Sequence, residues 1–433
     1  MRTMKDSEIG WIGQIPKNWL IKQAKFVLDI YTGATPKSQV PEYWDGDILW
    51  VTPADYKTED VYITDTKKHI TQSGYESCST TIVPRGSLIF SKRAPIGTVA
   101  IADKDLCTNQ GCLACVCNNN ALYKYIYYQM QSLSDIFNSL GEGTTFLEIS
   151  YSSFRSVKFV LPSLSEQKAI ADYLDDKCAK IDTTIAKRKA IIEKLKDYKS
   201  AVITKAVTKG LNPNVEMKDS GVKFIKNIPN KWNVKRLKFI LSKKLRYGAS
   251  ESGVEYNSNL PRYIRITDID ENGCLKNEGK LSLTEEAAKN YILEEDCILL
   301  ARSGATVGKT FLYTMEMPRS AFAGYLIQAI PNGDEITPKF FMYYTNSNPY
   351  WMWIGYIFEQ ATIMNVSAEK YQNLYVCYPS VSEQNDIVAY LDSQCAKIDE
   401  AIEKQEQAVA KLEEYRKSII YYAVTGKIDC RDI

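Results

Sequence analysis

The segment closest to a known ligand-binding motif is Gly304-Ala305-Thr306-Val307-Gly308-Lys309-Thr310, which contains most of a phosphate-binding loop. It is one residue short of the pattern G-x-x-x-x-G-K-[ST], because Ser303 stands where the first glycine is required. Asn348-Pro349-Tyr350 has only one of the two prolines in the Asn-Pro-Pro-Tyr motif of adenine methyltransferases. Neither segment predicts a catalytic centre, and we expect no catalytic residue in this chain.

Histidine and cysteine usage argues against a metal site. The chain has one histidine, His69, so neither imidazole acid–base chemistry nor a multi-histidine metal site is favoured. Cys112, Cys115 and Cys117 are close together, but Cys112–Cys117 is typical of an apolar strand, and a structural zinc ion needs four ligands. The 11 cysteines have no regular framework spacing, which favours reduced thiols and a cytoplasmic location.

Two segments place cationic side chains beside a turn rich in glycine or proline. A guanidinium group can donate two hydrogen bonds to guanine, and hydroxyl or backbone N–H groups can bind phosphate. The alternative is a solvated hairpin turn, and for Thr144-Thr145 a plain connector. The candidate nucleic-acid contacts are Lys92 and Arg93 in the first turn, and Arg302, Ser303, Thr306 and Lys309 in or directly after the second. Thr144, Thr145 and Arg265, from other segments, complete the set.

The elements that would position these residues occur twice. Leu161-Pro162-Ser163-Leu164-Ser165-Glu166-Gln167 returns 217 residues later as Tyr378-Pro379-Ser380-Val381-Ser382-Glu383-Gln384. The segment 88–97 aligns in the same way with 298–308, and the aromatic segment Tyr125–Tyr128 with Phe341–Tyr344. A repeat of this length predicts two copies of one structural unit related by an approximate two-fold axis. Because the loops between the shared segments differ, the two copies could bind different targets on one scaffold.

Each copy ends in a segment that predicts a long helix. A serine with glutamate three residues later fits a capping box in both, and Gly210 and Gly426 are expected to end the helices. Apolar residues follow at alternating steps of three and four, which predicts a coiled-coil seam. The seam residues are Ile181, Ile185, Ile192, Leu195 and Val202 in the first helix, and Ile398, Ile402, Val409, Leu412 and Ile419 in the second.

Charge and connectivity predict that these two helices pack against each other in antiparallel directions. Residues 164–209 contain 11 Lys and Arg and 7 Asp and Glu, a net charge of +4, whereas residues 381–425 contain 5 and 9, a net charge of −4. About 170 residues separate the helices, enough for a globular domain. Residues 181–207 would span ~40 Å, close to the ~34–36 Å of one turn of B-DNA.

These observations predict an α+β protein with internal duplication and pseudo-two-fold symmetry. We expect two α/β domains, at 1–163 and 211–380, separated by two long helices, at 164–210 and 381–433, that pack as an antiparallel coiled coil. No run of about 18 apolar residues is present, so no membrane contact is expected. The net charge of +2 in 433 residues neither requires nor excludes nucleic acid.

The order of these motifs resembles the specificity subunit of type I restriction–modification systems. The resemblance is carried by the paired Pro-Ser-x-Ser-Glu-Gln openings, by Cys178-Ala179-Lys180-Ile181-Asp182 and Cys395-Ala396-Lys397-Ile398-Asp399, and by the turns at 93–97 and 302–308. The segments Asp6-Ser7 to Trp19 and Asp219-Ser220 to Trp232 also match. Together they cover essentially the whole chain.

The resemblance implies a recognition and assembly role without chemistry of its own. Each globular domain would be a target recognition domain for one half of a bipartite double-stranded DNA sequence, and the helix pair would set the gap between the halves. The chain would dock two methylation subunits that carry S-adenosylmethionine, and restriction subunits that use ATP would join, so no cofactor is expected in this chain. Two alternatives are a coiled-coil protein–protein scaffold without sequence-specific DNA recognition and an active restriction or methylation enzyme. A scaffold explains the helices but not two divergent sets of loops on a shared framework.

Overall fold

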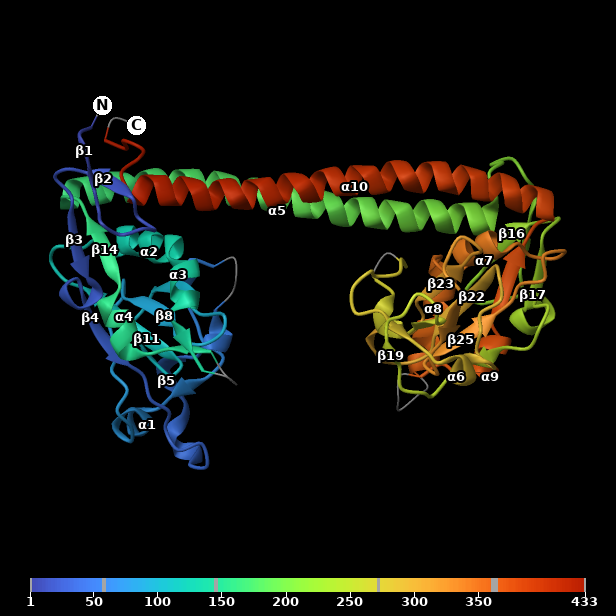
Figure 1. Ribbon diagram of the computed structural model, residues 1–433, viewed down its shortest axis with the longest axis horizontal. Helices are drawn as coiled ribbons and strands as arrows, with labels where there is room; N and C mark the ends of the chain where they lie inside the picture. Colours follow the sequence, from blue (N-terminus) through green and yellow to red (C-terminus); the bar gives the residue numbers. More distant parts are fainter. Residues whose placement is uncertain (1, 57–59, 144–146, 271–272, 360–364, 432–433) are drawn as a thin grey trace. The chain divides into compact units, whose positions relative to one another are not determined.

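The computed structural model describes residues 2–56, 60–143, 147–270, 273–359 and 365–431. Contacts divide the chain into two units (Figure 1). Unit 1 is Met1–Arg188 with Gln407–Ile433, and unit 2 is Lys189–Glu406. The helices α5 (Leu164–Lys209) and α10 (Val381–Val424) each contribute one part to each unit. Among the described residues, no helix is both long and apolar enough to cross a membrane.

Unit 1 is built on a five-stranded sheet with strand order β4-β11-β8-β9-β6. These strands are β4 (Leu28–Thr32), β11 (Cys112–Cys117), β8 (Leu88–Ser91), β9 (Val99–Ala102) and β6 (Tyr62–Ile63). The apolar runs of β8 and β9 are fully buried, as expected for strands covered on both faces, and Cys112–Cys117 forms the predicted strand. A second sheet has the order β10-β5-β7, in which β10 (Leu106–Thr108) runs parallel to β5 (Trp44–Val51) and β7 (His69–Ile70) runs antiparallel to it.

Shorter elements complete unit 1. Three two-stranded sheets pair β1 (Met4–Asp6) with β2 (Gln14–Pro16), β3 (Leu20–Gln23) with β14 (Lys158–Leu161), and β12 (Gly141–Glu142) with β13 (Glu148–Ile149). The helices are α1 (Gln72–Glu76), α2 (Tyr123–Ser132), α3 (Ser134–Ser139) and α4 (Tyr151–Ser156), with 3-10 turns η1 (Ala24–Phe26), η2 (Pro41–Tyr43) and η3 (Pro53–Asp55). Figure 1 shows α2 next to α5 and α10, and the Tyr125 hydroxyl donates to the Val424 carbonyl of α10 at 3.1 Å.

Unit 2 repeats this plan with two four-stranded sheets. The first has the order β18 (Arg246–Tyr247), β25 (Leu326–Ala329), β22 (Cys297–Ala301) and β23 (Thr310–Tyr313). The second has the order β19 (Val254–Glu255), β21 (Leu281–Ser282), β20 (Arg262–Ile264) and β24 (Ser320–Phe322), with β20 and β24 parallel. The paired strands β15 (Met217–Asp219) with β16 (Asn227–Pro229) and β17 (Asn233–Arg236) with β26 (Tyr375–Tyr378) complete its sheets. Its helices and turns are α6 (Glu285–Ala288), α7 (Pro338–Tyr344), α8 (Asn348–Glu359), α9 (Ala368–Gln372), η4 (Leu237–Phe239), η5 (Ile266–Asp268) and η6 (Gly304–Thr306).

The helices α5 and α10 pack in antiparallel directions within each unit. In unit 1 the start of α5 lies near residues that follow α10, since Glu166 is 4.0 Å from Arg431, while Asp182 pairs with Arg416 at 2.8 Å. In unit 2 Lys199 pairs with Asp399 at 2.7 Å. The pair of Lys199 with Asp399 joins a cation of the basic helix to an anion of the acidic one, as the opposite net charges predict, whereas the pair of Asp182 with Arg416 has the reverse polarity. Gly210 and Gly426 follow the two helices with φ of +72° and +73°, which confirms them as helix stops.

The predicted seam residues face the interior of the two units. Buried among them are Ile181, Ile185, Ile192, Ile398, Val409 and Ile419. The half-buried ones are Leu195, Val202, Ile402 and Leu412. Since none of the ten is exposed, the steps of three and four do mark the packed side of each helix.

The helix openings make only part of the predicted capping box: at the second helix Ser380 Oγ accepts from the Glu383 N–H at 3.5 Å, but the glutamate half is replaced at both. The Glu166 and Glu383 carboxylates do not turn back to their capping serines; instead they accept hydrogen bonds from Trp19 Nε1 at 3.0 Å and Trp232 Nε1 at 3.1 Å. A buried indole N–H needs an acceptor, so the tryptophan competes successfully for the carboxylate. The glutamates therefore attach each helix start to the globular unit.

The glutamines that follow do the same in both units. The Gln167 side chain accepts from the Leu122 N–H and donates to the Asn120 carbonyl, at 2.8 and 2.9 Å. Gln384 bonds to the Thr337 N–H and the Glu335 carbonyl, both at 2.8 Å. The repeated Ser-Glu-Gln segment is thus the joint between helix and domain in each copy.

Matching contacts also correct the alignment of the aromatic helices. Tyr128 donates to Asp175 at 2.8 Å, and Tyr343 donates to Asp392 at 2.7 Å. Tyr128 therefore corresponds to Tyr343, and Tyr125 corresponds to Phe340 rather than Phe341, one residue from the sequence alignment. The shift does not affect the predicted fold class, which is confirmed: an α+β protein with internal duplication and two long helices packed antiparallel.

Candidate nucleic-acid interface

The two predicted cationic turns occupy equivalent places, at the end of β8 in unit 1 and of β22 in unit 2. The Lys92 N–H donates to the Gly111 carbonyl at 2.9 Å, and the Arg302 N–H donates to the Tyr325 carbonyl at 3.0 Å. Both turns thus start from a central buried strand, which fixes the backbone while the side chains extend beyond the sheet. The alignment of Lys92 with Arg302 is confirmed.

In unit 1 both cationic side chains bind one carboxylate. Glu148 contacts Lys92 Nζ at 2.7 Å through Oε1 and Arg93 Nε at 2.9 Å through Oε2. Partial burial alone would raise the pKa of Glu148, but hydrogen bonds from the two cations outweigh it and hold that pKa below its usual range. Lys92 is 13 % exposed, Glu148 31 % and Arg93 46 %. Arg93 is thus the cation most available to a ligand.

In unit 2 the equivalent cation binds neutral groups. Arg302 Nε donates to Asn365 Oδ1 at 3.3 Å, Nη1 lies 3.5 Å from the Gly324 carbonyl, and Cζ lies 4.8 Å from the Tyr247 ring centroid in a cation–π contact. These contacts orient the guanidinium. A planar, oriented guanidinium suits bidentate recognition of guanine or phosphate.

The remaining candidates of unit 2 differ in how free their side chains are. The Thr306 hydroxyl oxygen is buried and has no hydrogen-bond partner among the described residues, and Lys309 is half-buried on the same turn. Ser303 forms a backbone bridge with Asn365. Arg265 lies on a different turn, where Asp268 at 2.6 Å and the Gly279 carbonyl at 2.8 Å hold its guanidinium.

Thr144 and Thr145 lie outside the described residues. The segments Val51-Thr52 and Ile266-Thr267 look alike in the sequence but are not equivalent in the structure. The Thr52 N–H donates to Asp55, and the Arg265 N–H donates to Asp268, both at 2.8 Å, so Thr52 corresponds to Arg265. The strands before these turns differ in length, with eight residues in β5 and three in β20, which hides this register from the sequence.

Glu148 and Asn365 are not among the predicted contacts, although both bind candidate residues. The signal was available in the repeat itself, because the offset of 217 that relates the helix openings also relates residue 148 to residue 365. Their contact with the cationic turns was not visible, since Glu148 lies 55 residues from Arg93 in the chain. Only the folded sheet brings them together.

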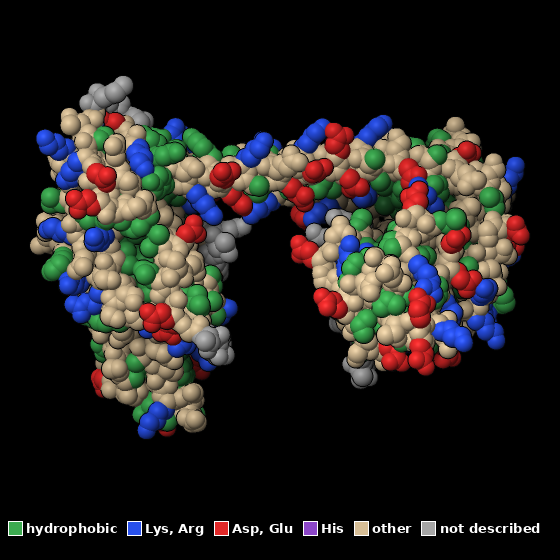
Figure 2. Space-filling view, in the orientation of Figure 1, with side chains coloured by type: hydrophobic (Ala, Val, Ile, Leu, Met, Phe, Trp, Pro, Cys, Tyr) green, Lys and Arg blue, Asp and Glu red, His purple; other side chains and the backbone are tan. Residues whose placement is uncertain are grey.

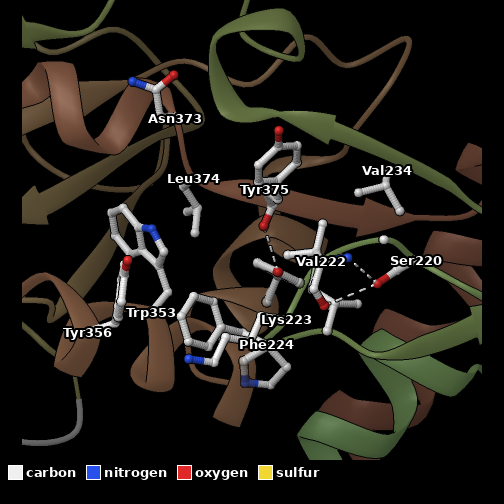
Figure 3. A pocket seen from close by; sticks show the side chains of 14 residues that line it. Ser220, Val222, Lys223, Phe224, Val234, Trp353, Tyr356, Asn373, Leu374 and Tyr375 are labelled. Carbon is white, nitrogen blue, oxygen red and sulfur yellow. Dashed lines mark hydrogen bonds between the residues drawn. The ribbon is translucent and has the colours of Figure 1, made fainter.

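The cavities lie away from these clusters or touch them only at an edge. In unit 2 a cavity of about 400 Å³ is lined by aromatic side chains, among them Phe224, Trp353, Tyr356 and Tyr375 (Figure 3), and by none of the predicted contacts. In unit 1 a cleft of about 640 Å³ is lined partly by Gly97 and Thr98 of the cationic turn. Figure 2 shows Lys and Arg side chains interspersed with Asp and Glu on both units. The face seen in Figure 2 has no broad basic patch, and the two turns are the features that indicate nucleic-acid contact.

Comparison with known proteins gives a consistent result. The family model of the type I restriction modification DNA specificity domain matches residues 16–196 and again 229–412. The MjaIX specificity subunit of a type I restriction enzyme from Methanocaldococcus jannaschii is 32 % identical over 308 residues, 68 % of each chain. The EcoBI specificity subunit from Escherichia coli is 24 % identical over 367 residues, 80 % of this chain and 76 % of that one. A chain from a solved type I restriction–modification structure shares the fold, with a TM-score of 0.72, 15 % identity and coverage of 96 % of this chain and 99 % of that one.

Proposed function

The chain belongs to the family of DNA specificity subunits of type I restriction–modification systems, and we propose that each of its two units reads one half of a bipartite DNA target. The observation that carries this proposal is the pair of equivalent turns. The turn after β8 carries Lys92-Arg93 in unit 1, and the turn after the equivalent strand β22 carries Arg302-Ser303 in unit 2. Equivalent placement with different side chains is what two readers of different sequences require.

The helix pair would set the gap between the two half-sites and dock the partner subunits. Two methylation subunits would supply S-adenosylmethionine and the methyl transfer, and restriction subunits would use ATP, all in the cytoplasm. This chain would contribute recognition and assembly but no cofactor. The duplicated joints at Trp19–Glu166 and Trp232–Glu383 support two similar docking surfaces, because the same tryptophan–glutamate hydrogen bond attaches each helix opening to its unit.

Mapping of methylated sites tests this function directly. Cells that carry this chain with its neighbouring methylation subunit are compared with cells that lack this chain. We expect a bipartite adenine motif that disappears with the chain. An unchanged pattern, with the methylation subunit shown to be active and bound, would favour the scaffold alternative.

Two further changes separate the roles of the parts. Replacing residues 1–163 with those of another specificity subunit should alter one half of the motif, and a change in both halves would contradict two independent readers. Adding one heptad to both α5 and α10 in register, ~10 Å, should change the preferred gap. An unchanged gap would exclude the helices as the spacer.

A further inference from the structure

The residue that faces the cationic turn is the same position in both units. In unit 1 the Ile149 N–H donates to the Lys92 carbonyl at 3.0 Å, and in unit 2 the Val366 N–H donates to the Arg302 carbonyl at 2.8 Å. The residues immediately before them, Glu148 and Asn365, form backbone bridges with Arg93 and Ser303 respectively. One backbone arrangement therefore presents a carboxylate in unit 1 and an amide in unit 2.

The Glu148 carboxylate retains the capacity to bind a further donor. Lys92 and Arg93 occupy one site on each of its oxygens, whereas a carboxylate offers roughly four lone-pair sites. An acceptor-only anion beside DNA repels phosphates and base-edge acceptors. In the major groove the compatible partners are the amino groups of cytosine N4 and adenine N6.

Asn365 has the complementary property. Arg302 can only donate hydrogen bonds, so the atom that faces its Nε must be the amide oxygen of Asn365. The Nδ2 group then remains as the donor. Donors at this position match the base-edge acceptors of guanine, thymine or adenine N7.

The two clusters are nevertheless balanced in charge. Lys92, Arg93 and Glu148 together carry +1, and Arg302 with Ser303 and Asn365 also carries +1. The additional cation in unit 1 is thus compensated by the additional anion. The clusters differ in which hydrogen bonds they offer, while their attraction to the DNA backbone is similar.

We propose that Glu148 and Asn365 determine base preference in the two half-sites: Glu148 accepts a hydrogen bond from the amino group of cytosine or adenine, and Asn365 donates one to a base-edge acceptor. This assignment rests on the proposed function. It adds a specific chemical requirement: on the strand that faces Glu148, the contacted base is cytosine or adenine, and guanine or thymine at that position of the same strand is rejected.

The test is methylation-site mapping with the full complex that contains Glu148→Gln, Asn365→Glu or the wild-type chain. Glu148→Gln adds a donor and removes the charge, so discrimination for the amino-bearing base should fall roughly 10- to 100-fold, in one half-site only. Asn365→Glu should change the other half-site only. Glu285→Gln is the matched control: it breaks an exposed carboxylate–arginine pair with Arg319, at 2.6 Å, and should leave both halves unchanged.

The outcomes distinguish the proposal from its premise. If the wild-type chain directs no bipartite motif, the proposed function itself fails. If the wild-type motif is present but both variants keep the same base preferences, with methylation merely slower, the two residues support the turns without reading bases and the inference is overturned. Because the two variants lie in different units, a folding defect in one leaves the other half-site as a valid test.

Discussion

The same substitution should lower the free energy of unfolding by different amounts at the two equivalent glutamates, Glu166 and Glu383. Glu166 is 6 % exposed, accepts from Trp19 Nε1 at 3.0 Å and pairs with Arg2 at 2.5 Å, and Arg2 is itself only 13 % exposed. Glu383 is half-buried and accepts from Trp232 Nε1 at 3.1 Å. A glutamine can still accept the tryptophan hydrogen bond at either site. In unit 1, however, it removes the carboxylate that compensates a buried guanidinium.

Breaking a buried ion pair lowers the free energy of unfolding by about 3–5 kcal/mol. In Glu166→Gln, Arg2 still has its ion pair with Asp429 at 2.6 Å, so we expect a smaller loss of about 2 kcal/mol. For Glu383→Gln, which only replaces one acceptor by another, we expect less than about 1 kcal/mol. In calorimetry of the full chain, the larger loss corresponds to a fall in Tm of roughly 4–8 °C for a domain of this size. Equal losses for the two variants would refute the reasoning, because the tryptophan bond would then be the main contribution at both openings.

Three further predictions concern the helix stops, the helix pair and the thiols. In urea unfolding, Gly426→Ala should lower the free energy of unfolding by more than about 2 kcal/mol, because its Cβ would lie 2.5 Å from Pro16 Cδ and φ is +73°. Gly221→Ala is the control: its φ is +69°, but a Cβ there meets no atom within 4 Å, so the loss should be only about 1 kcal/mol. Lys199→Ala should lower the free energy of unfolding by less than about 1 kcal/mol, because the pair of Lys199 with Asp399 is exposed. Arg416→Ala should lower it by more, since Arg416 is 22 % exposed and bonds to both Asp182 and Gln131. Denaturation midpoints that rank the two variants in the opposite order would contradict this. Burial raises the pKa of Cys107, Cys112, Cys117 and Cys377 to about 12, so at pH 8 iodoacetamide should modify exposed Cys274 well before these four. Because their folded-state pKa lies above the unfolded value of about 8.5, these thiols contribute stability that is present below that pH and is lost as pH rises toward about 12, which alkaline unfolding curves can measure.

The fold was largely predictable because the chain contains its own internal comparison. The seam positions follow from the period of the apolar residues, and Gly210 and Gly426 follow from the need for a left-handed residue after each helix. The partners of Glu166 and Glu383 were not predictable, because the spacing of serine and glutamate is the same whether the carboxylate bonds to the capping residue or to a distant tryptophan. Only the position of Trp19, 147 residues away from Glu166, decides between them.

The candidate interface was predictable only in part, for a similar reason. Lys92, Arg93 and Arg302 could be chosen from residue type and turn composition, which are local properties of the sequence. Their neighbours depend on sheet pairing: Glu148 reaches Arg93 across 55 residues, and Asn365 reaches Arg302 across 63. The sequence alone therefore indicates which residues can donate hydrogen bonds, but not which of those donors are already engaged.

The contrast between the joints and the turns leads to a transfer experiment. Gln167 and Gln384 make the same backbone contacts in both units, whereas the turns keep the backbone contacts and exchange the side chains. The triple variant Lys92→Arg, Arg93→Ser, Glu148→Asn gives unit 1 the polar set of unit 2 and keeps its net charge of +1. The substituted positions lie beside the sheet core rather than within it, so stability should change by less than about 1 kcal/mol.

If the turns read bases, the triple variant should alter the half-site of unit 1 and leave the gap and the other half-site intact. The methylated motif and the unfolding midpoint together decide the result. A variant that is as stable as the wild type and directs the same motif would show that the base preference resides outside these turns. A variant that loses stability would show instead that Glu148 holds the turn together, because its contacts with Lys92 and Arg93 are the ones that the substitution removes.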